Sequence, residues 1–126
     1  MESRSLSFKE LKVWKKSREL RKEIAVLVKG FPKDERFLLV DQMKRASRSI
    51  TANIAEGHGR FHFKENIKFC LYSRGSASEM IDHLTVAVDE EYIDQSTSDV
   101  LEEKFEEVMK MLNGYIRHLH KKQREK

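Results

Sequence analysis

The chain has 126 residues, the size of one domain with a single hydrophobic core. Charged residues make up 37% of it, there is one proline, and the formal net charge of +4 is too small to define a nucleic-acid-binding protein by itself. No apolar run reaches the ~20 residues that span a bilayer. The N-terminus lacks the apolar segment of a signal peptide, and a single cysteine excludes an internal disulfide. We therefore expect no membrane contact and a location in the reducing cytoplasm.

The first amphipathic segment covers residues 8–29. Ser7 and Glu10 fit a capping box, in which two side chains satisfy the free N–H groups at a helix start. Apolar and small residues then recur at spacings of three and four, which places them on one stripe: Val13, Ser17, Leu20, Ile24, Leu27 and Phe31. Gly30 and Pro32 are typical of a helix end.

The second segment, residues 34–56, keeps this spacing, and we expect Gly57 to stop the helix. The third segment, residues 63–90, contains the run RGSASE. Its glycine, Gly75, would weaken an isolated helix by about 1 kcal/mol relative to alanine. Because small side chains let a neighbouring backbone approach, the run indicates a close helix crossing.

The fourth segment, residues 96–122, begins where a serine or threonine near Ser96 would cap the helix. A basic C-terminal tail follows its last apolar position, Leu119. No stretch alternates polar and apolar residues as a strand does. The connections are short, so successive helices should pack antiparallel. The sequence therefore predicts an all-α protein, an up-down-up-down antiparallel four-helix bundle in one domain, residues 1–126.

Two stretches, FPKDERFLLVDQMKRASRSITANIAEGHGR and FCLYSRGSASEM, resemble the S23 ribosomal, or 23S rRNA intervening-sequence, proteins, a family of four-helix bundles. The resemblance covers about residues 8–120 and is most specific at Asn-Ile-Ala-Glu-Gly, residues 53–57. The matching positions are Leu11, Trp14, Phe31, Pro32, Glu35, Gln42, Lys44, Arg45, Ala46, Ser49, Ile50, Asn53, Ile54, Ala55, Glu56, Gly57, Gly75, Ser76 and Glu79. Ser73 and Arg74 depart from it, because alanine and an apolar residue are common there.

The resemblance also implies an assembly and a partner. The family is similar to the accessory proteins of diversity-generating retroelements, which form pentameric barrels and bind nucleic acid. By resemblance, we expect this chain to be a homopentamer that acts near RNA or DNA.

Polar residues border the apolar stripe of the second segment, and a comparable row lies on the third. The residues of these rows are Gln42, Arg45, Ser49, Asn53, Glu56, Ser76 and Glu79. Because buried polar groups need partners, we interpret the rows as a structural network or a subunit contact. The alternative is acid–base catalysis by Glu56 and Glu79, but no nucleophile or metal cluster accompanies them.

The other reactive side chains give weak signals. Glycines interrupt the spacing of His58 and His62, and Cys70 lies on an apolar stripe, which favours a core position. No Cys/His set has the spacing of a structural zinc site. We therefore expect a non-enzymatic protein with no metal, no cofactor and no small-molecule substrate.

Charge is unevenly distributed. Residues 8–29 hold eight Lys or Arg against three Glu, whereas residues 75–107 hold eleven Asp or Glu against one Lys. In a four-helix bundle both chain ends lie at the same end, so the basic residues there would form one cap. The candidates for nucleic-acid binding are Lys9, Lys12, Lys15, Lys16, Arg18, Lys22, Arg117, Lys121 and Lys122.

Two functions therefore compete. The first is an oligomeric bundle that contacts RNA or DNA phosphates without reading bases. The second is a protein-interaction or scaffold module in which the acidic stretch from Asp89 to Glu107 meets basic faces of other subunits or proteins, with no role for nucleic acid. An ordinary solvated lysine-rich face would explain the same composition.

Overall fold

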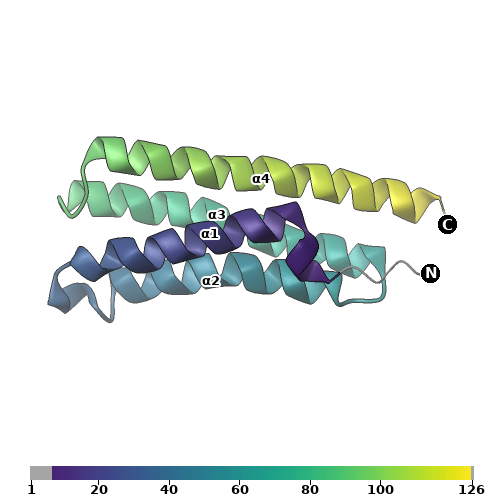
Figure 1. Cartoon of the computed structure of the whole chain (residues 1–126), viewed down its shortest axis with the longest axis horizontal. Coiled ribbons are helices and arrows are strands. Elements are labelled where there is room, and N and C mark those ends of the chain that lie inside the picture. Colours follow the sequence, from purple (N-terminus) through teal and green to yellow (C-terminus); the bar gives the residue numbers. More distant parts are fainter. Residues whose placement is uncertain (1–6, 126) are drawn as a thin grey trace.

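The computed structural model describes residues 7–125. Its α-helices are α1 (Lys12–Leu27), α2 (Leu39–His58), α3 (Phe63–Asp89) and α4 (Gln95–Arg124), and short 3-10 turns lie before α1 and between α1 and α2: η2 (Phe8–Glu10), η3 (Val28–Gly30) and η4 (Lys33–Glu35). The helices lie side by side and reverse direction at each connection (Figure 1). Helix α1 contacts α2 and α4, and α3 contacts the same two. The predicted all-α four-helix fold is confirmed.

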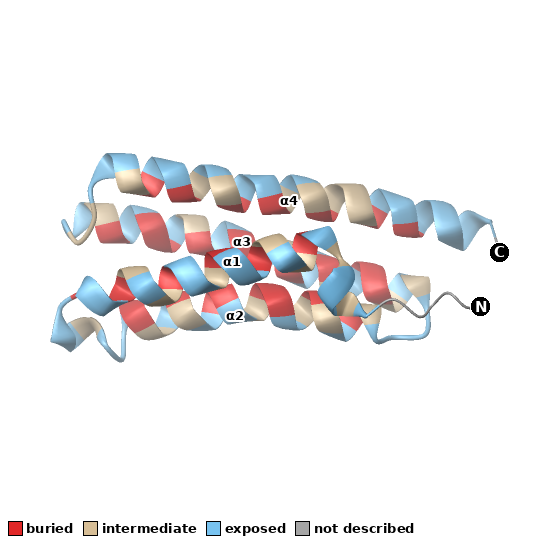
Figure 2. Cartoon of the chain, viewed as in Figure 1, coloured by how far each residue is buried: buried red, intermediate tan, exposed pale blue. Residues whose placement is uncertain are grey.

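The core lies along the inner faces of the helices, where buried positions recur as stripes (Figure 2). The predicted stripes account for most of it, and Phe105, Leu112 and Leu84 have no exposed surface at all. Burying an apolar side chain of this size contributes about 1.5–3 kcal/mol, so these stripes stabilise the bundle far more than helix propensity does. None of the described helices is long and apolar enough to cross a membrane.

The start of α1 differs from the predicted capping box. The Ser7 hydroxyl accepts a hydrogen bond from the Lys9 N–H at 3.1 Å and so caps the 3-10 turn η2 rather than α1. Leu11 is extended, with φ −70° and ψ 128°, and separates this turn from the helix. The rings of Phe8 and Trp14 meet edge to face at 5.3 Å, which holds the turn against α1.

Helix α4 also starts differently. Asp94 is its cap, and one carboxylate oxygen accepts a hydrogen bond from the Thr97 N–H at 2.8 Å. Hydrogen bonds from Thr97 lower the pKa of Asp94 below its usual value. The predicted serine or threonine cap near Ser96 is therefore wrong by a residue or two, because the Asp94 carboxylate accepts the hydrogen bond that a serine or threonine hydroxyl would accept.

The close helix crossing involves Gly57, which the sequence analysis took for a helix stop. Helix α2 runs through this buried glycine to His58. A Cβ at Gly57 would lie 2.7 Å from the Asn66 Oδ1 atom and 2.9 Å from the Phe69 Cβ atom, so α3 passes directly over it. By contrast, a Cβ at Gly75 would meet nothing within 4 Å. Gly75 itself therefore does not face α2, whereas Ser76 and Ala77 of the same run do approach the bundle interior, Ser76 through a 2.9 Å hydrogen bond to Ser49 of α2.

Ser73 and Ala77, which flank Gly75 in α3, are fully buried. The Ser73 hydroxyl donates a 2.8 Å hydrogen bond to the Ile50 carbonyl of α2. The hydroxyl of Ser73, where the family commonly has alanine, is thus hydrogen-bonded within the core. The Arg74 guanidinium reaches α4 instead, where it donates to the Asn113 side chain at 2.7 Å.

A hydrogen-bonded cluster joins the α1–α2 connection to the α3–α4 turn. The Tyr92 hydroxyl donates to the Glu35 carboxylate at 2.6 Å, and that carboxylate accepts from the Leu39 N–H at 3.2 Å. The Tyr92 ring also packs on Phe31, with ring centroids 5.2 Å apart. The Glu35 hydrogen bond raises the pKa of Tyr92 to about 12.

Tyr92 is therefore expected to ionise about two pH units above a free tyrosine, whose pKa is about 10. The native state binds this proton more tightly than the unfolded state does, so the stabilisation is complete below pH ~10 and is lost as pH rises through ~12. Ultraviolet difference titration of the native protein minus the Tyr92→Phe variant should give this pKa. Glu35→Gln should bring it back towards 10, and an unshifted Tyr92 in the native protein would contradict the hydrogen bond.

Candidate nucleic-acid interface

Three members of the predicted polar rows come together between α2 and α3. The Asn53 amide donates to the Ser49 carbonyl and to the Ser49 hydroxyl, both at 2.9 Å. The Ser76 hydroxyl of α3 donates to the same Ser49 hydroxyl at 2.9 Å. Each of these side chains is half-buried. This part of the network fastens α2 to α3 within one chain.

The other predicted members lie outside that cluster. Gln42 is exposed, and Arg45 pairs with Asp41 of its own helix at 2.8 Å. Glu79 meets the buried His83 at 2.9 Å. These side chains are engaged within one helix or face solvent, and a subunit contact at them stays a prediction.

Glu56 differs most from expectation, because it is exposed rather than inward. Its carboxylate pairs with the Arg60 guanidinium at 2.8 Å. Ile54 and Gly57 take the buried positions on either side of it, so Glu56 points outward. Of the pair Asn53 and Glu56, Asn53 belongs to the cluster that joins α2 to α3, whereas Glu56 pairs with Arg60.

The buried thiol is chemically quiet. Cys70 has no exposed surface, and burial raises its pKa to about 11. A thiol with this pKa is almost wholly protonated at neutral pH and is a poor nucleophile. Within residues 7–125, no group of three or more His, Cys, Asp or Glu side chains is arranged to hold a metal ion.

The outward side of α1 carries a basic surface, which we call the α1 basic face. It surrounds a shallow cavity of about 590 Å³. The residues that line this cavity are Lys9, Trp14, Lys15, Arg18, Glu19, Arg21 and Lys22. Five cations thus face one carboxylate. The Arg18 guanidinium lies 5.8 Å from the centre of the Trp14 ring, a cation–π contact that keeps the cation at the surface.

Two arginines that the sequence analysis did not select extend this face towards α2. The Arg21 guanidinium donates to the Thr51 hydroxyl at 3.0 Å, and that hydroxyl donates to the Arg48 carbonyl at 3.1 Å. Arg48 is exposed. Arg21 follows Arg18 by three residues and was therefore detectable from helical spacing, whereas the contact with α2 required the fold.

Lys12 and Lys16 lie on a different side of α1. Lys16 is half-buried and pairs with Glu107 of α4 at 3.2 Å. Glu23 of α1 pairs with Lys104 of α4 at 3.1 Å. Lys12 is exposed beside a small hollow that Tyr115 of α4 also lines. Because Lys16 is already paired with a carboxylate of α4, it is a poor candidate for a phosphate contact.

The three C-terminal candidates, Arg117, Lys121 and Lys122, are exposed on the last turns of α4. Lys122 has Glu125 3.8 Å away. The start of α1 and the end of α4 lie at the same end of the bundle (Figure 1), as expected. In the described part of the chain, no ion pair or hydrogen bond joins these cations to α1. They form a second basic group at that end.

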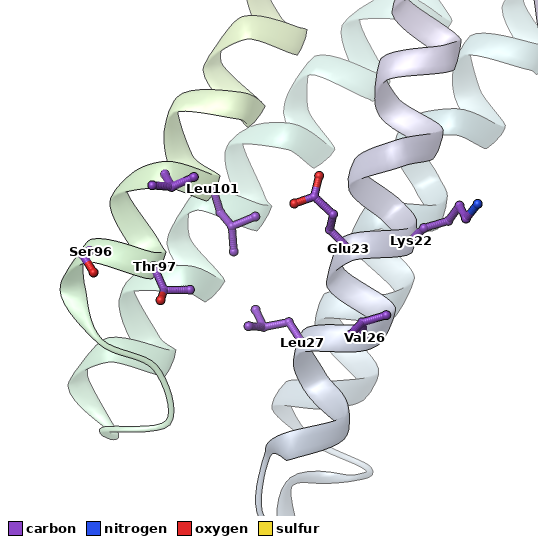
Figure 3. A pocket seen from close by; sticks show the side chains of 8 residues that line it. Lys22, Glu23, Val26, Leu27, Ser96, Thr97 and Leu101 are labelled. Atoms are coloured by element: carbon purple, nitrogen blue, oxygen red, sulfur yellow. The ribbon is translucent and has the colours of Figure 1, made fainter.

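An apolar groove opens between α1 and α4 at the opposite end of the bundle. Leu27 and Leu101 point towards each other across it, with Glu23 above them (Figure 3). Its volume is about 660 Å³. Val26 is 66% exposed and Val100 is 55% exposed along its walls. Exposed valines on both walls leave an apolar surface that a protein partner would cover.

The helices and the α1 basic face define an all-α four-helix bundle with one cationic face. The chain belongs to the 23S rRNA-intervening sequence protein family, whose model matches residues 9–114. Among solved structures it is similar to a protein of unknown function from the S23 ribosomal protein family of Bacteroides thetaiotaomicron. The TM-score of this match is 0.77 and the sequence identity is 25%. The match covers 83% of this chain and 95% of that chain. No curated protein matches the chain. The predicted family is confirmed.

Proposed function

We propose that this protein is a non-enzymatic, homo-oligomeric bundle that contacts RNA or DNA phosphates through the α1 basic face. The observation that carries the proposal is the gathering of five cations and one carboxylate around a single exposed cavity. Membership of the 23S rRNA-intervening sequence family supports a role close to RNA. The α1 basic face keeps four residues that were selected from the sequence, Lys9, Lys15, Arg18 and Lys22, and adds Arg21 and Arg48. We also propose that the protein is located in the cytoplasm.

A surface of this kind binds through charge. Each phosphate that a lysine or arginine neutralises releases counterions, so the logarithm of affinity falls by about 0.7–0.9 per contact for each tenfold rise in salt. Phosphate contacts fix the position of a nucleic acid but carry no sequence information. We therefore expect salt-dependent binding that ignores base sequence.

Neutralising the face tests the proposal. The variant Lys15→Gln, Arg18→Gln, Lys22→Gln should reduce the salt slope by about 2–3, because up to three phosphate contacts are lost. Fluorescence anisotropy with a labelled RNA oligonucleotide at several salt concentrations measures this slope. The matched control, Lys33→Gln, Arg36→Gln, Lys110→Gln, removes the same charge from exposed positions elsewhere and should keep it. Absence of wild-type binding at low salt, or equal slopes in both variants, would reject the proposal.

The second candidate function is protein interaction, and the apolar groove between α1 and α4 favours it. Its exposed valines suit a second copy of the chain or another protein. Glu23 and Glu107 are engaged with lysines across α1 and α4, so the acidic groups left for a partner include Glu102, Glu103 and Glu106. The expectation of five subunits comes from the family resemblance, and a measurement of the mass in solution would test it.

A further inference from the structure

The turn between α2 and α3 presents an aromatic side chain to solvent. Phe61 is 87% exposed, more than any other large apolar residue in the described chain. Its neighbour His62 meets it edge to face, with ring centroids 5.0 Å apart. A phenylalanine left this open gives up the stabilisation that burial would provide, so no core packing explains it.

The aromatic surface continues onto α3. The Arg60 guanidinium lies 4.9 Å from the centre of the Phe69 ring, and Phe69 meets Tyr72 edge to face at 5.5 Å. Tyr72 is about half exposed. The turn and the first three turns of α3 therefore carry rings and a guanidinium plane in succession, which are the flat surfaces on which nucleic-acid bases stack.

The charges around this surface favour an anion. The Arg60 guanidinium lies 2.8 Å from the Glu56 carboxylate and 4.0 Å from the Glu65 carboxylate, so one positive charge faces two negative charges. Lys64 and Lys68 are exposed, and neither makes an ion pair in the part of the chain that the structure describes. With these two lysines included, three cations stand against two carboxylates around the turn, a net charge of +1.

The turn lies at the same end of the bundle as the start of α1 (Figure 1). The 3-10 turn η2, which carries Lys9, packs on α2, the helix that leads into the turn. A nucleic-acid strand that binds along the α1 basic face and extends beyond η2 would therefore pass close to Phe61. Duplex bases are stacked on each other and offer no face to a ring, whereas unpaired bases do.

We propose that the α2–α3 turn is a stacking platform for unpaired bases, in which Phe61 stacks on a base and Lys64 and Lys68 contact the phosphates beside it. The inference rests on the proposed nucleic-acid function and adds that the bound strand is single. Stacking tolerates any base, so this platform selects unpaired over paired strands without reading sequence.

The test compares Phe61→Ala with Phe37→Ala, a change at another exposed phenylalanine at the opposite end of the bundle. Anisotropy with a labelled single-stranded RNA and with a duplex of equal length gives the two affinities. Phe61→Ala should weaken single-strand binding about tenfold, leave duplex binding unchanged and keep the salt slope, because it removes stacking and no charge. Phe37→Ala should match the wild type on both probes.

A gain-of-signal variant gives direct evidence. Phe61→Trp should retain single-strand binding, and its added tryptophan fluorescence should be quenched when the single strand binds but not when the duplex does. Equal single-strand affinities for the wild type and Phe61→Ala, with binding intact, would overturn the platform and leave the α1 basic face standing. Absence of wild-type binding to either probe would overturn both proposals.

Discussion

Replacing Gly57 by alanine is expected to lower the free energy of unfolding by about 1–2 kcal/mol. The new Cβ would lie 2.9 Å from the Phe69 Cβ atom and 3.0 Å from the Asn66 carbonyl oxygen, and neither atom moves unless α3 moves. Overpacking of this kind costs about 1–3 kcal/mol, towards the upper end where several contacts are short. The cost exceeds the gain of about 1 kcal/mol that alanine brings to a helix interior.

The matched control is Gly75→Ala, the same substitution within α3. Nothing lies within 4 Å of the new methyl group there, so helix propensity acts alone and stability should rise by up to about 1 kcal/mol. Urea unfolding followed by circular dichroism, at two protein concentrations to separate self-association, gives both values. If both alanine substitutions raise the free energy of unfolding, α3 does not pass closely over Gly57.

Placing two charges in the apolar groove is expected to dissociate the proposed oligomer. The variant Val26→Glu, Val100→Glu puts carboxylates on both walls of the groove, where a partner would have to bury them unpaired. Both valines are exposed in the single chain, so the fold itself should be retained. Light scattering should give the mass of one chain, 14.9 kDa, for the variant and a multiple of it for the wild type.

Leu71→Glu, a similar change at an exposed position of α3, is the control and should leave the oligomer intact. Dissociation by Leu71→Glu and not by the groove variant would place the subunit contact on α3 instead. A wild type with the mass of one chain would reject self-association altogether.

The helices were predictable because their signal is periodic. Phe105, Val108 and Leu112 recur at spacings of three and four residues, and burial follows that spacing. Helix ends were less predictable, since several residues compete to cap one terminus. Asp94 caps α4 although Ser96 is also suited to the role.

The roles of single residues depended on partners distant in sequence. Gly57 is typical of a helix end when read alone, and only the passage of α3 over it shows why a side chain is excluded. Lys16 is one of many lysines until Glu107 meets it across the bundle. Phe61 lies in a short connection with no periodic pattern, so its exposure could not be predicted from the sequence.

The shared location of the chain ends has a practical consequence for any fusion protein. The turn η2, which precedes α1, and the last turns of α4 lie at the end of the bundle that also carries the α2–α3 turn (Figure 1). An affinity tag or a fluorescent domain attached at either terminus would crowd that end and compete with a bound strand. Labels are better inserted in the connection around Arg36, at the far end, where they leave the surface near Phe61 open.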